Sequence, residues 1–131
     1  MYISRNWLKD FVNIPDSLSA KDLGLKITMA MAEVEGWVDQ KESLKNVVVG
    51  EILEVKKHPN ADKLQLAIVD VGTKKLNIVC GAPNIAKGQK VPVALVGAKL
   101  PNGLEIAKAK VRGEESEGML CAEDELGMGT D

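Results

Sequence analysis

The sequence has few of the residues from which metal sites and disulfide scaffolds are built. Its 131 residues include one histidine and two cysteines, Cys80 and Cys121, which have no CxxC spacing. Two cysteines are too few for a disulfide scaffold, and a structural zinc site needs four ligands. These counts argue against a metal site, and a reducing cytoplasm is the expected location.

Long apolar runs are also missing. The longest run, residues 91–98, has eight residues and contains a proline and a glycine, whereas a helix needs about 18 apolar residues to cross a bilayer. The first residues lack the apolar stretch of a secretion signal. At 45% apolar and 27% charged residues, the composition fits a globular protein of one domain or one domain with an appendage. We expect no membrane partner.

Aromatic residues are scarce and lie at one end of the chain. All four precede residue 38: Tyr2, Trp7, Phe11 and Trp37. The two parts of the chain must build their cores from different side chains, so we predict two domains, residues 1–40 and 41–131. Forty residues bury little surface by themselves, so the first domain should need a packing partner.

Charge is distributed unevenly behind a net value of −2. Residues 1–44 hold five basic and seven acidic residues, residues 45–112 twelve and five, and residues 113–131 none and seven. The three segments therefore carry −2, +7 and −7. Such asymmetry indicates a surface for a polyanion, although a solvated face rich in lysine would give the same count.

From residue 47 onward the pattern is that of short strands. Alternating and β-branched runs predict five strands and one helical turn, with Gly50 as a bulge in the first strand. The strands cover residues 47–55, 64–71, 75–80, 91–96 and 104–112, and the helical turn covers 83–88. This order is typical of a Greek-key barrel of the oligonucleotide/oligosaccharide-binding (OB) type, with a five-stranded sandwich as the alternative.

The first 40 residues show a mixed pattern. Apolar spacing after serine or asparagine caps predicts helices over 4–12 and 19–27, and residues 29–37 predict a strand. The predicted fold class is therefore mainly β, a five-stranded Greek-key OB-fold barrel with a short α/β N-terminal segment.

The predicted fifth strand contains three cations in alternation. Lys108, Lys110 and Arg112 would share one face of a strand, about 6.6 Å apart. A basic stripe of this kind binds phosphates, because each neutralised phosphate releases counterions. The alternative is an edge strand that uses lysine to prevent aggregation. Because the barrel has no aromatic residue on which bases could stack, we expect a folded RNA rather than a single strand.

The single histidine and the two cysteines allow a different kind of site as an alternative. His58 and Cys80 could form a thiol or metal site if the fold brought them together. Cys80 ends an alternating strand, however, and fits a small core residue.

Several short motifs, taken together, resemble a known family. Residues 58–64 (HPNADKL), 69–72 (VDVG), 78–84 (IVCGAPN) and 116–121 (SEGMLC) resemble the tRNA-binding domain. Residues 4–8 (SRNWL), Thr28 and residues 33–36 (EVEG) resemble the amino terminus of bacterial phenylalanyl-tRNA synthetase beta subunits. Besides the three cations above, the candidate RNA-binding residues within these motifs are His58, Asn60, Lys63, Asn84, Ser116 and Met119.

The resemblance implies a larger parent enzyme. That enzyme joins phenylalanine to its tRNA, uses ATP and Mg, and is a tetramer of two alpha and two beta subunits. The chain would then be an amino-terminal fragment without catalytic activity, and residues 1–40 would form half of a small domain completed by a later segment. Alternatives are a free-standing tRNA-binding protein and a module for subunit assembly with little RNA contact.

Overall fold

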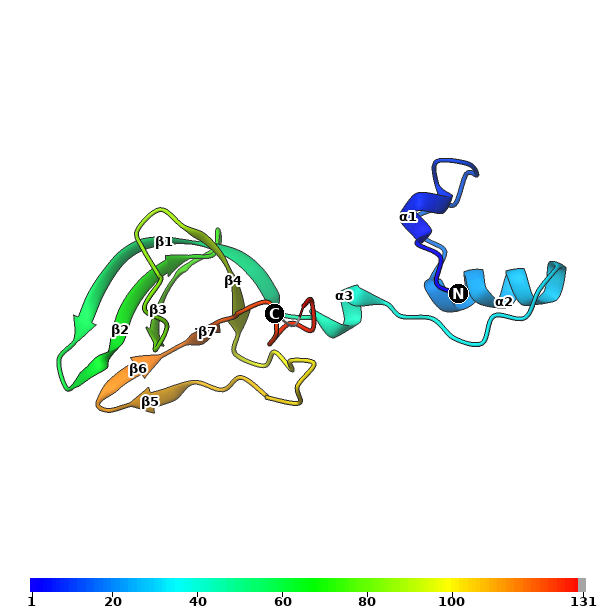
Figure 1. Ribbon diagram of the computed structural model, residues 1–131. Helices are drawn as coiled ribbons and strands as arrows, with labels where there is room; N and C mark the ends of the chain where they lie inside the picture. Colours follow the sequence, from blue (N-terminus) through cyan, green and yellow to red (C-terminus); the bar gives the residue numbers. More distant parts are fainter. Residues whose placement is uncertain (130–131) are drawn as a thin grey trace. The chain divides into compact units, whose positions relative to one another are not determined.

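The strands of the chain form the antiparallel barrel that the alternating pattern predicts (Figure 1). The computed structural model describes residues 1–129. Its strands are β1 (Val47–His58), β2 (Ala61–Asp70), β3 (Lys75–Cys80), β4 (Lys90–Leu95), β5 (Ala109–Val111), β6 (Glu114–Ser116) and β7 (Gly118–Leu120). The main sheet has the order β3-β2-β1-β4-β7, and β5 and β6 form a separate hairpin. The prediction of a five-stranded OB-type barrel is confirmed.

Backbone and side-chain hydrogen bonds between β3 and the end of the chain nearly close the barrel. Glu117 N–H donates to the carbonyl of Asn77 at 2.8 Å, and Val79 N–H donates to Ser116 Oγ at 3.1 Å. The same hydroxyl donates to the carbonyl of Gly118 at 3.0 Å. The first two bonds join β3 to the segment where β6 passes into β7, so they span the seam at which β3 and β7 do not pair directly.

The core of the barrel consists of aliphatic side chains from alternating positions. β1, β2 and β3 contribute one face each, because successive side chains of a strand point to opposite sides. The largest fully buried side chains are Ile52, Val69, Leu76, Ile78 and Val93. A second buried cluster contains residues from β4 to the end of the chain: Ala94, Ala98, Leu100, Ile106, Cys121 and Leu126.

Gly50 is a site of close packing rather than a bulge. Its register with β4 is regular, and the two irregularities of the β1–β2 pairing lie between Ile52 and Glu54 and between Lys57 and His58. A Cβ at Gly50 would lie 2.7 Å from both Val69 Cγ1 and Val93 Cγ2. Only glycine fits there, because both valines are fully buried.

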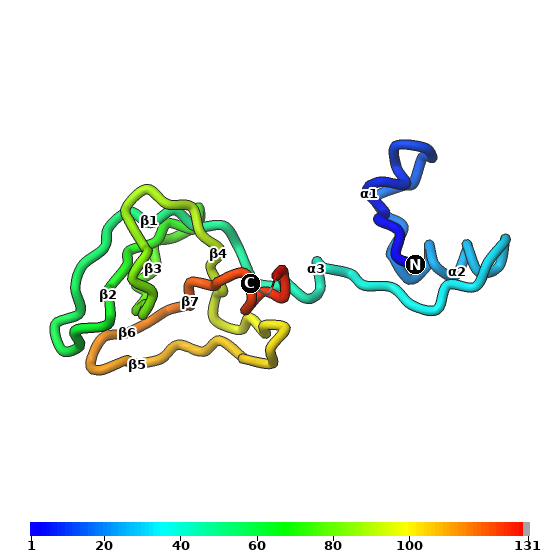
Figure 2. The backbone as a smooth tube through the Cα atoms, in the orientation of Figure 1, coloured from blue at the N-terminus to red at the C-terminus, as the bar shows by residue number. Residues whose placement is uncertain are grey.

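The fifth strand of the barrel is β7 and not residues 104–112. After β4 the chain runs through residues 96–108, makes the β5–β6 hairpin and returns as β7, which pairs with β4 (Figure 2). Within the predicted strand, residues 109–111 pair with β6, and Glu105 forms only an isolated bridge with Lys99. The prediction was wrong because alternation of lysine with alanine marks any extended hairpin, inside or outside the main sheet.

Two further sequence-based assignments were wrong. Residues 83–88 form two turns and no helix, because glycine, proline and asparagine favour turns in so short a connection. Residues 29–37 form no strand: α2 (Ala20–Ala30) continues into this stretch, and residues 33–39 have no regular structure.

Residues 1–40 form a separate unit made of helices and loops. It contains α1 (Arg5–Leu8) and α2, and α3 (Gln40–Ser43) begins at its end. The hydroxyl of Ser4 accepts the backbone N–H of Trp7, and that of Ser19 accepts the backbone N–H of Asp22, so both helices begin at serine caps. Many apolar side chains of this unit are exposed, including Trp7, Phe11 and Met29. None of the helices within residues 1–129 has the length and apolar character that crossing a membrane requires.

Candidate nucleic-acid interface

Two turns meet at one end of the barrel. The β1–β2 turn contains Pro59 and Asn60, and the β5–β6 turn contains Arg112 and Gly113 (Figure 1). In OB barrels the ligand surface consists of strands 2 and 3 with the loops that join strands 1 to 2 and 4 to 5. The β5–β6 hairpin lies within the connection between the fourth and fifth barrel strands. Both turns therefore lie where OB barrels generally carry their ligand surface.

Side-chain hydrogen bonds hold the two turns together. The ring of His58 is buried, and its Nε2 lies 3.1 Å from the carbonyl oxygen of Val111. Asn60 Nδ2 donates to the carbonyl of Arg112 at 3.4 Å. These bonds join segments more than 50 residues apart in the chain, so the position of the hairpin depends on them.

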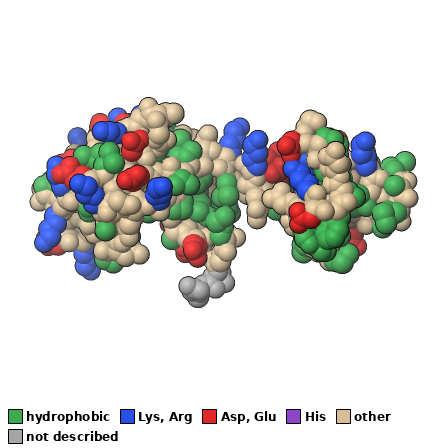
Figure 3. Space-filling view, turned by 90° about the horizontal axis from the view of Figure 1, so that it is seen from above, with side chains coloured by type: hydrophobic (Ala, Val, Ile, Leu, Met, Phe, Trp, Pro, Cys, Tyr) green, Lys and Arg blue, Asp and Glu red, His purple; other side chains and the backbone are tan. Residues whose placement is uncertain are grey.

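Free cations gather around this pair of turns. Lys57 stands opposite Gln65 in the β1–β2 pair, Lys63 lies just after the turn, and Lys110 and Arg112 lie on the hairpin. All four cations are exposed, and none makes an ion pair within residues 1–129. We call Lys57, Lys63, Lys110 and Arg112 the hairpin-end cluster. In Figure 3 several Lys and Arg side chains lie at the end of the barrel that contains these turns, with acidic side chains among them.

A shallow depression of about 320 Å³ joins two of the sequence motifs at the same end. It is lined by Asp62, Lys63, Gln65, Gly81 and Pro83. The amide Nε2 of Gln65 donates to the carbonyl of Ala82 at 3.1 Å and so connects β2 to the loop after β3. Asn84, exposed in that loop, follows Pro83 directly.

One of the three cations of the predicted basic stripe, Lys108, is neutralised by glutamates that follow in the hairpin. Lys108 Nζ lies 2.9 Å from Glu115 Oε2 and 3.8 Å from Glu117 Oε1. The hydrogen bond and the charge of Glu115 raise the pKa of Lys108, and those of Lys108 lower the pKa of Glu115. Over residues 45–120 there are twelve basic and eight acidic residues, a net of +4, because β6 brings its glutamates back to the barrel.

The alternation predicted for the stripe also ends before Arg112. Lys108 precedes β5, Lys110 lies within it, and Arg112 occupies the turn with a φ of +47°. A left-handed residue does not continue the pleat of a strand, so the three cations do not form one straight row. Lys110 stands across the hairpin from Glu115, but neither Lys110 nor Arg112 makes an ion pair within residues 1–129, whereas Lys108 does.

Three of the residues that the motifs suggested as RNA contacts are held inside the fold. His58 uses both ring nitrogens, since Nδ1 accepts the N–H of Asn60 at 3.0 Å. Ser116 is buried and uses its hydroxyl at the barrel seam. Met119 lies on β7, half-buried against the second hydrophobic cluster. Each of these three side chains bonds or packs within the fold, which the motifs alone did not show.

The thiol or metal alternative finds no support in the arrangement of these side chains. Both nitrogens of His58 contact the backbone, and Cys80 is a buried residue whose sulfur accepts the N–H of Ala82 at 3.4 Å. Burial raises the pKa of the Cys121 thiol, which is the reverse of an activated nucleophile. Across residues 1–129 no group of three or more His, Cys, Asp or Glu side chains could hold a metal ion.

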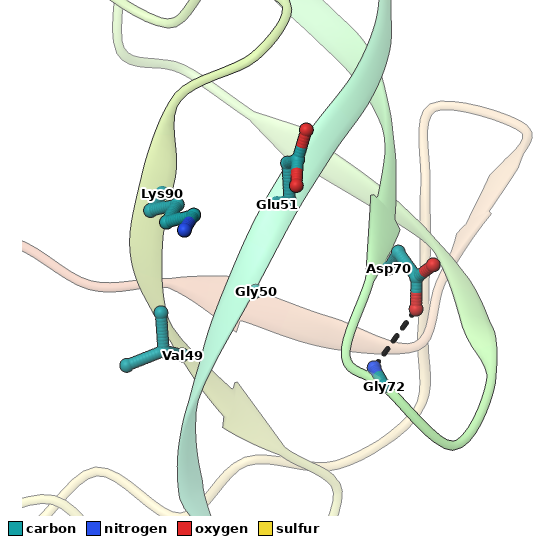
Figure 4. Close-up of a pocket in the computed structure, with 6 residues that line it drawn as sticks. All are labelled: Val49, Gly50, Glu51, Asp70, Gly72 and Lys90. Atoms are coloured by element: carbon teal, nitrogen blue, oxygen red, sulfur yellow. Dashed lines mark hydrogen bonds between the residues drawn. The ribbon is translucent and has the colours of Figure 1, made fainter.

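A second depression lies near the other end of the barrel. It has about 300 Å³ and is lined by Val49, Gly50, Glu51, Asp70, Gly72 and Lys90 (Figure 4). Asp70 Oδ1 accepts the N–H of Gly72 at 2.8 Å and shapes the β2–β3 turn. Glu51 pairs with Asp70 across β1 and β2, Glu51 also pairs with Lys90, and Asp70 also pairs with Lys75. The cations near this depression therefore have carboxylates as strand neighbours.

Sequence reasoning missed two residues of the candidate interface, Lys57 and Gln65. The two residues are neighbours because Lys57 pairs with Gln65 in the β1–β2 register. The irregularity between Lys57 and His58 shifts that register, and a count of residues back from the turn therefore gives a different pairing. The motif at residues 58–64 was the available signal, because Lys57 directly precedes it.

Comparison with known proteins decides the family. The family model described as "Putative tRNA binding domain" matches residues 47–131. The chain belongs to this tRNA-binding domain family. The match includes all seven strands and the two turns at the hairpin end, so the hairpin-end cluster is a feature of a tRNA-binding domain.

Relatives of the tRNA-binding domain extend the similarity to the first 40 residues. The chain is 52% identical over 126 residues to the phenylalanine–tRNA ligase beta subunit of Oleidesulfovibrio alaskensis, and 50% identical over 129 residues to that of Bacillus subtilis. These alignments cover 96% and 98% of this chain but 16% of each relative. The chain thus spans about one sixth of the length of the curated relatives that it matches.

A solved structure supports the fold assignment. The crystal structure of the MetRS related protein from Pyrococcus horikoshii aligns with a TM-score of 0.50 and 26% identity. The alignment covers 69% of this chain and 83% of that protein. The chain therefore has the same barrel fold as that protein, most of which lies within the alignment.

Proposed function

We propose that this chain is the tRNA-binding module of a phenylalanine–tRNA ligase beta subunit and that the hairpin-end cluster contacts tRNA phosphates. The observation that carries the proposal is the family match over residues 47–131 combined with about 50% identity to beta subunits across both units. The parent protein would act in the cytoplasm, join phenylalanine to its tRNA with ATP and Mg, and assemble with an alpha subunit as a tetramer of two alpha and two beta subunits. The fragment itself would bind RNA and catalyse nothing.

The arrangement of cations favours recognition of an RNA backbone. Four cations that make no ion pair within residues 1–129 lie on the two turns and adjoining strands of one barrel end. The sequence of the barrel has no aromatic side chain on which a base could stack. Such a surface binds phosphates and recognises the shape of a folded RNA. We propose that Lys57, Lys63, Asn84, Lys110 and Arg112 contact the RNA. The motif residues His58, Asn60, Ser116 and Met119, together with Lys108, would support the fold around these contacts.

Residues 1–40 would form part of a second, split domain in the parent protein. The exposed apolar side chains of this unit support the proposal, because forty residues leave them without a core. A segment outside the present sequence would complete that domain.

Salt-dependent tRNA binding tests the proposed interface. A variant with Lys57→Ala, Lys63→Ala and Arg112→Ala loses three cations, so the slope of log affinity against log salt should fall by about 2–3. A control with Lys74→Ala, Lys75→Ala and Lys90→Ala removes the same charge near the opposite end. Fluorescence anisotropy with folded tRNA between about 50 and 200 mM salt measures both slopes. Equal losses in the two variants would refute a localised interface, and no binding by the unmodified chain would refute the RNA function.

The exposed apolar residues of the first unit favour assembly as a second candidate function. Trp7 and Phe11 make an edge-to-face contact with ring centroids 5.6 Å apart, yet both remain more than half exposed. Size-exclusion chromatography of the chain with a purified alpha subunit tests this candidate. Complex formation in the absence of tRNA binding would favour the assembly module, and the gene sequence after codon 131 would separate both from a free-standing tRNA-binding protein.

A further inference from the structure

The backbone of Arg112 adopts a conformation that arginine normally avoids. Arg112 and Gly113 have φ values of +47° and +101°, and they connect Val111 to Glu114 in a two-residue hairpin. Positive φ at both central positions defines a type I′ turn, in which asparagine followed by glycine is preferred. An arginine at the first position is strained, so the surrounding structure must hold it there.

Two hydrogen bonds from the β1–β2 turn supply that restraint. His58 bonds to the carbonyl of Val111, which belongs to the peptide plane before the Cα of Arg112. Asn60 bonds to the carbonyl of Arg112, which belongs to the peptide plane after it. The φ and ψ angles of a residue are the rotations of these two planes about its Cα. Anchoring both planes therefore anchors the left-handed conformation of Arg112.

The protonation state of His58 follows from its two partners. Nδ1 accepts the backbone N–H of Asn60, so this nitrogen carries no proton. Nε2 faces a carbonyl oxygen, which can only accept, so Nε2 carries the proton and donates. His58 is thus a neutral imidazole with the proton on Nε2, and its buried ring has no nitrogen left for an RNA contact.

We propose that His58 and Asn60 are positioning residues that present the guanidinium of Arg112 to an RNA phosphate. The inference rests on the function proposed above. It adds which residues at the hairpin end contact RNA and which hold the contacting residue in place. The guanidinium group is planar, permanently charged and suited to bidentate phosphate binding, so its direction matters more than that of a lysine. The left-handed backbone places Arg112 in the turn and outside the regular alternation of β5, where Lys110 lies.

A double-mutant cycle with Asn60 and Arg112 tests the positioning role in the full chain. Arg112→Ala should weaken tRNA binding roughly tenfold at low salt through loss of a charge-assisted contact. Asn60→Ala should weaken it by a smaller factor, and in the Arg112→Ala background it should have no further effect. Asn102→Ala is the matched control, because Asn102 Oδ1 accepts the N–H of Leu104 at 2.9 Å in a different turn.

The outcomes of the cycle test the positioning role of Asn60 separately from the proposed RNA-binding function. Independent effects of Asn60→Ala and Arg112→Ala would show that Asn60 touches RNA itself and would overturn the positioning role. An unchanged affinity in Asn60→Ala would overturn it as well. Failure of the unmodified chain to bind tRNA would instead overturn the proposed function.

Nuclear magnetic resonance of the free chain provides a readout that does not depend on RNA. We expect ¹⁵N shifts of a neutral His58 ring protonated at Nε2 and a backbone coupling of Arg112 that corresponds to positive φ. Asn60→Ala should move the Arg112 coupling while leaving the strands of the barrel intact. A His58 ring protonated at Nδ1, or an Arg112 coupling unchanged in Asn60→Ala, would overturn the restraint.

Discussion

Replacing Arg112 by asparagine should stabilise the fold and weaken RNA binding in a single change. Arg112 is the first central residue of a type I′ turn, with φ +47°, and Gly113 follows it with φ +101°. Asn-Gly is the preferred pair in such a turn, because the short asparagine side chain tolerates the left-handed conformation. The substitution therefore removes backbone strain and removes a cation from the hairpin-end cluster.

The size of both effects follows from the geometry. A left-handed conformation costs an ordinary residue roughly 1–2 kcal/mol, of which asparagine should recover about 0.5–1 kcal/mol in the free energy of unfolding. In a domain of this size that gain corresponds to a rise in Tm of about 2–8 °C. If Arg112 contacts one phosphate, the salt slope of tRNA binding should fall by about 0.7–0.9.

Two measurements on the same protein samples separate stability from binding. Thermal unfolding followed by circular dichroism reports Tm, and anisotropy of labelled tRNA across a salt series reports affinity and slope. Lys110→Gln is the matched control, since Lys110 lies in β5 with ordinary strand geometry and makes no ion pair within residues 1–129. This control should lose affinity without a rise in Tm.

Two results would refute the reasoning about Arg112. A lower Tm in Arg112→Asn would mean that the arginine side chain stabilises the hairpin by more than its backbone strain costs. A higher Tm with unchanged tRNA affinity and slope would mean that the strained turn serves the fold alone and that Arg112 does not touch RNA.

Three further substitutions test the remaining parts of the structure. Glu115→Gln frees Lys108 from its main partner, so tRNA affinity and salt slope should rise in anisotropy, and Glu51→Gln at the other end should change them less. Gly50→Ala should lower the unfolding free energy by about 1–3 kcal/mol in denaturant titration through overpacking, while Gly81→Ala, whose Cβ would lie 3.6 Å from its nearest neighbour, should be nearly neutral. Ser116→Ala leaves the Val79 N–H at the seam without its partner and should cost about 1–3 kcal/mol in the same titration.

Most of the barrel could be predicted because its strands are long and locally consistent. The β-branched run at residues 47–55 and the alternation at 75–80 lie within strands of the structure, and the buried positions follow the period of two. β7 was missed because Gly118, Met119 and Leu120 form a strand of three residues, too short for any period to be visible. Its existence depends on pairing with β4, which lies more than 20 residues earlier in the chain.

The basic stripe illustrates a limit of counting charges along a sequence. Dividing the sequence after Arg112 puts the three cations of the stripe in the basic segment. It puts Glu114, Glu115 and Glu117, which follow directly, in the acidic segment. The hairpin folds those glutamates back beside the cations, and Glu115 pairs with Lys108 at 2.9 Å. Local charge density depends on which strands are neighbours, and no sum over a segment contains that information.

The sequence by itself determined the strand-forming segments, the absence of base-stacking aromatics from the barrel and the motifs that identify the family. These properties are local, since they depend on residue types and on spacings of a few positions. Tertiary structure decided which cations are free, which motif residues are buried and how Arg112 is presented. Those properties depend on hydrogen bonds such as that between His58 and Val111, 53 residues apart, which only the closed barrel brings within reach.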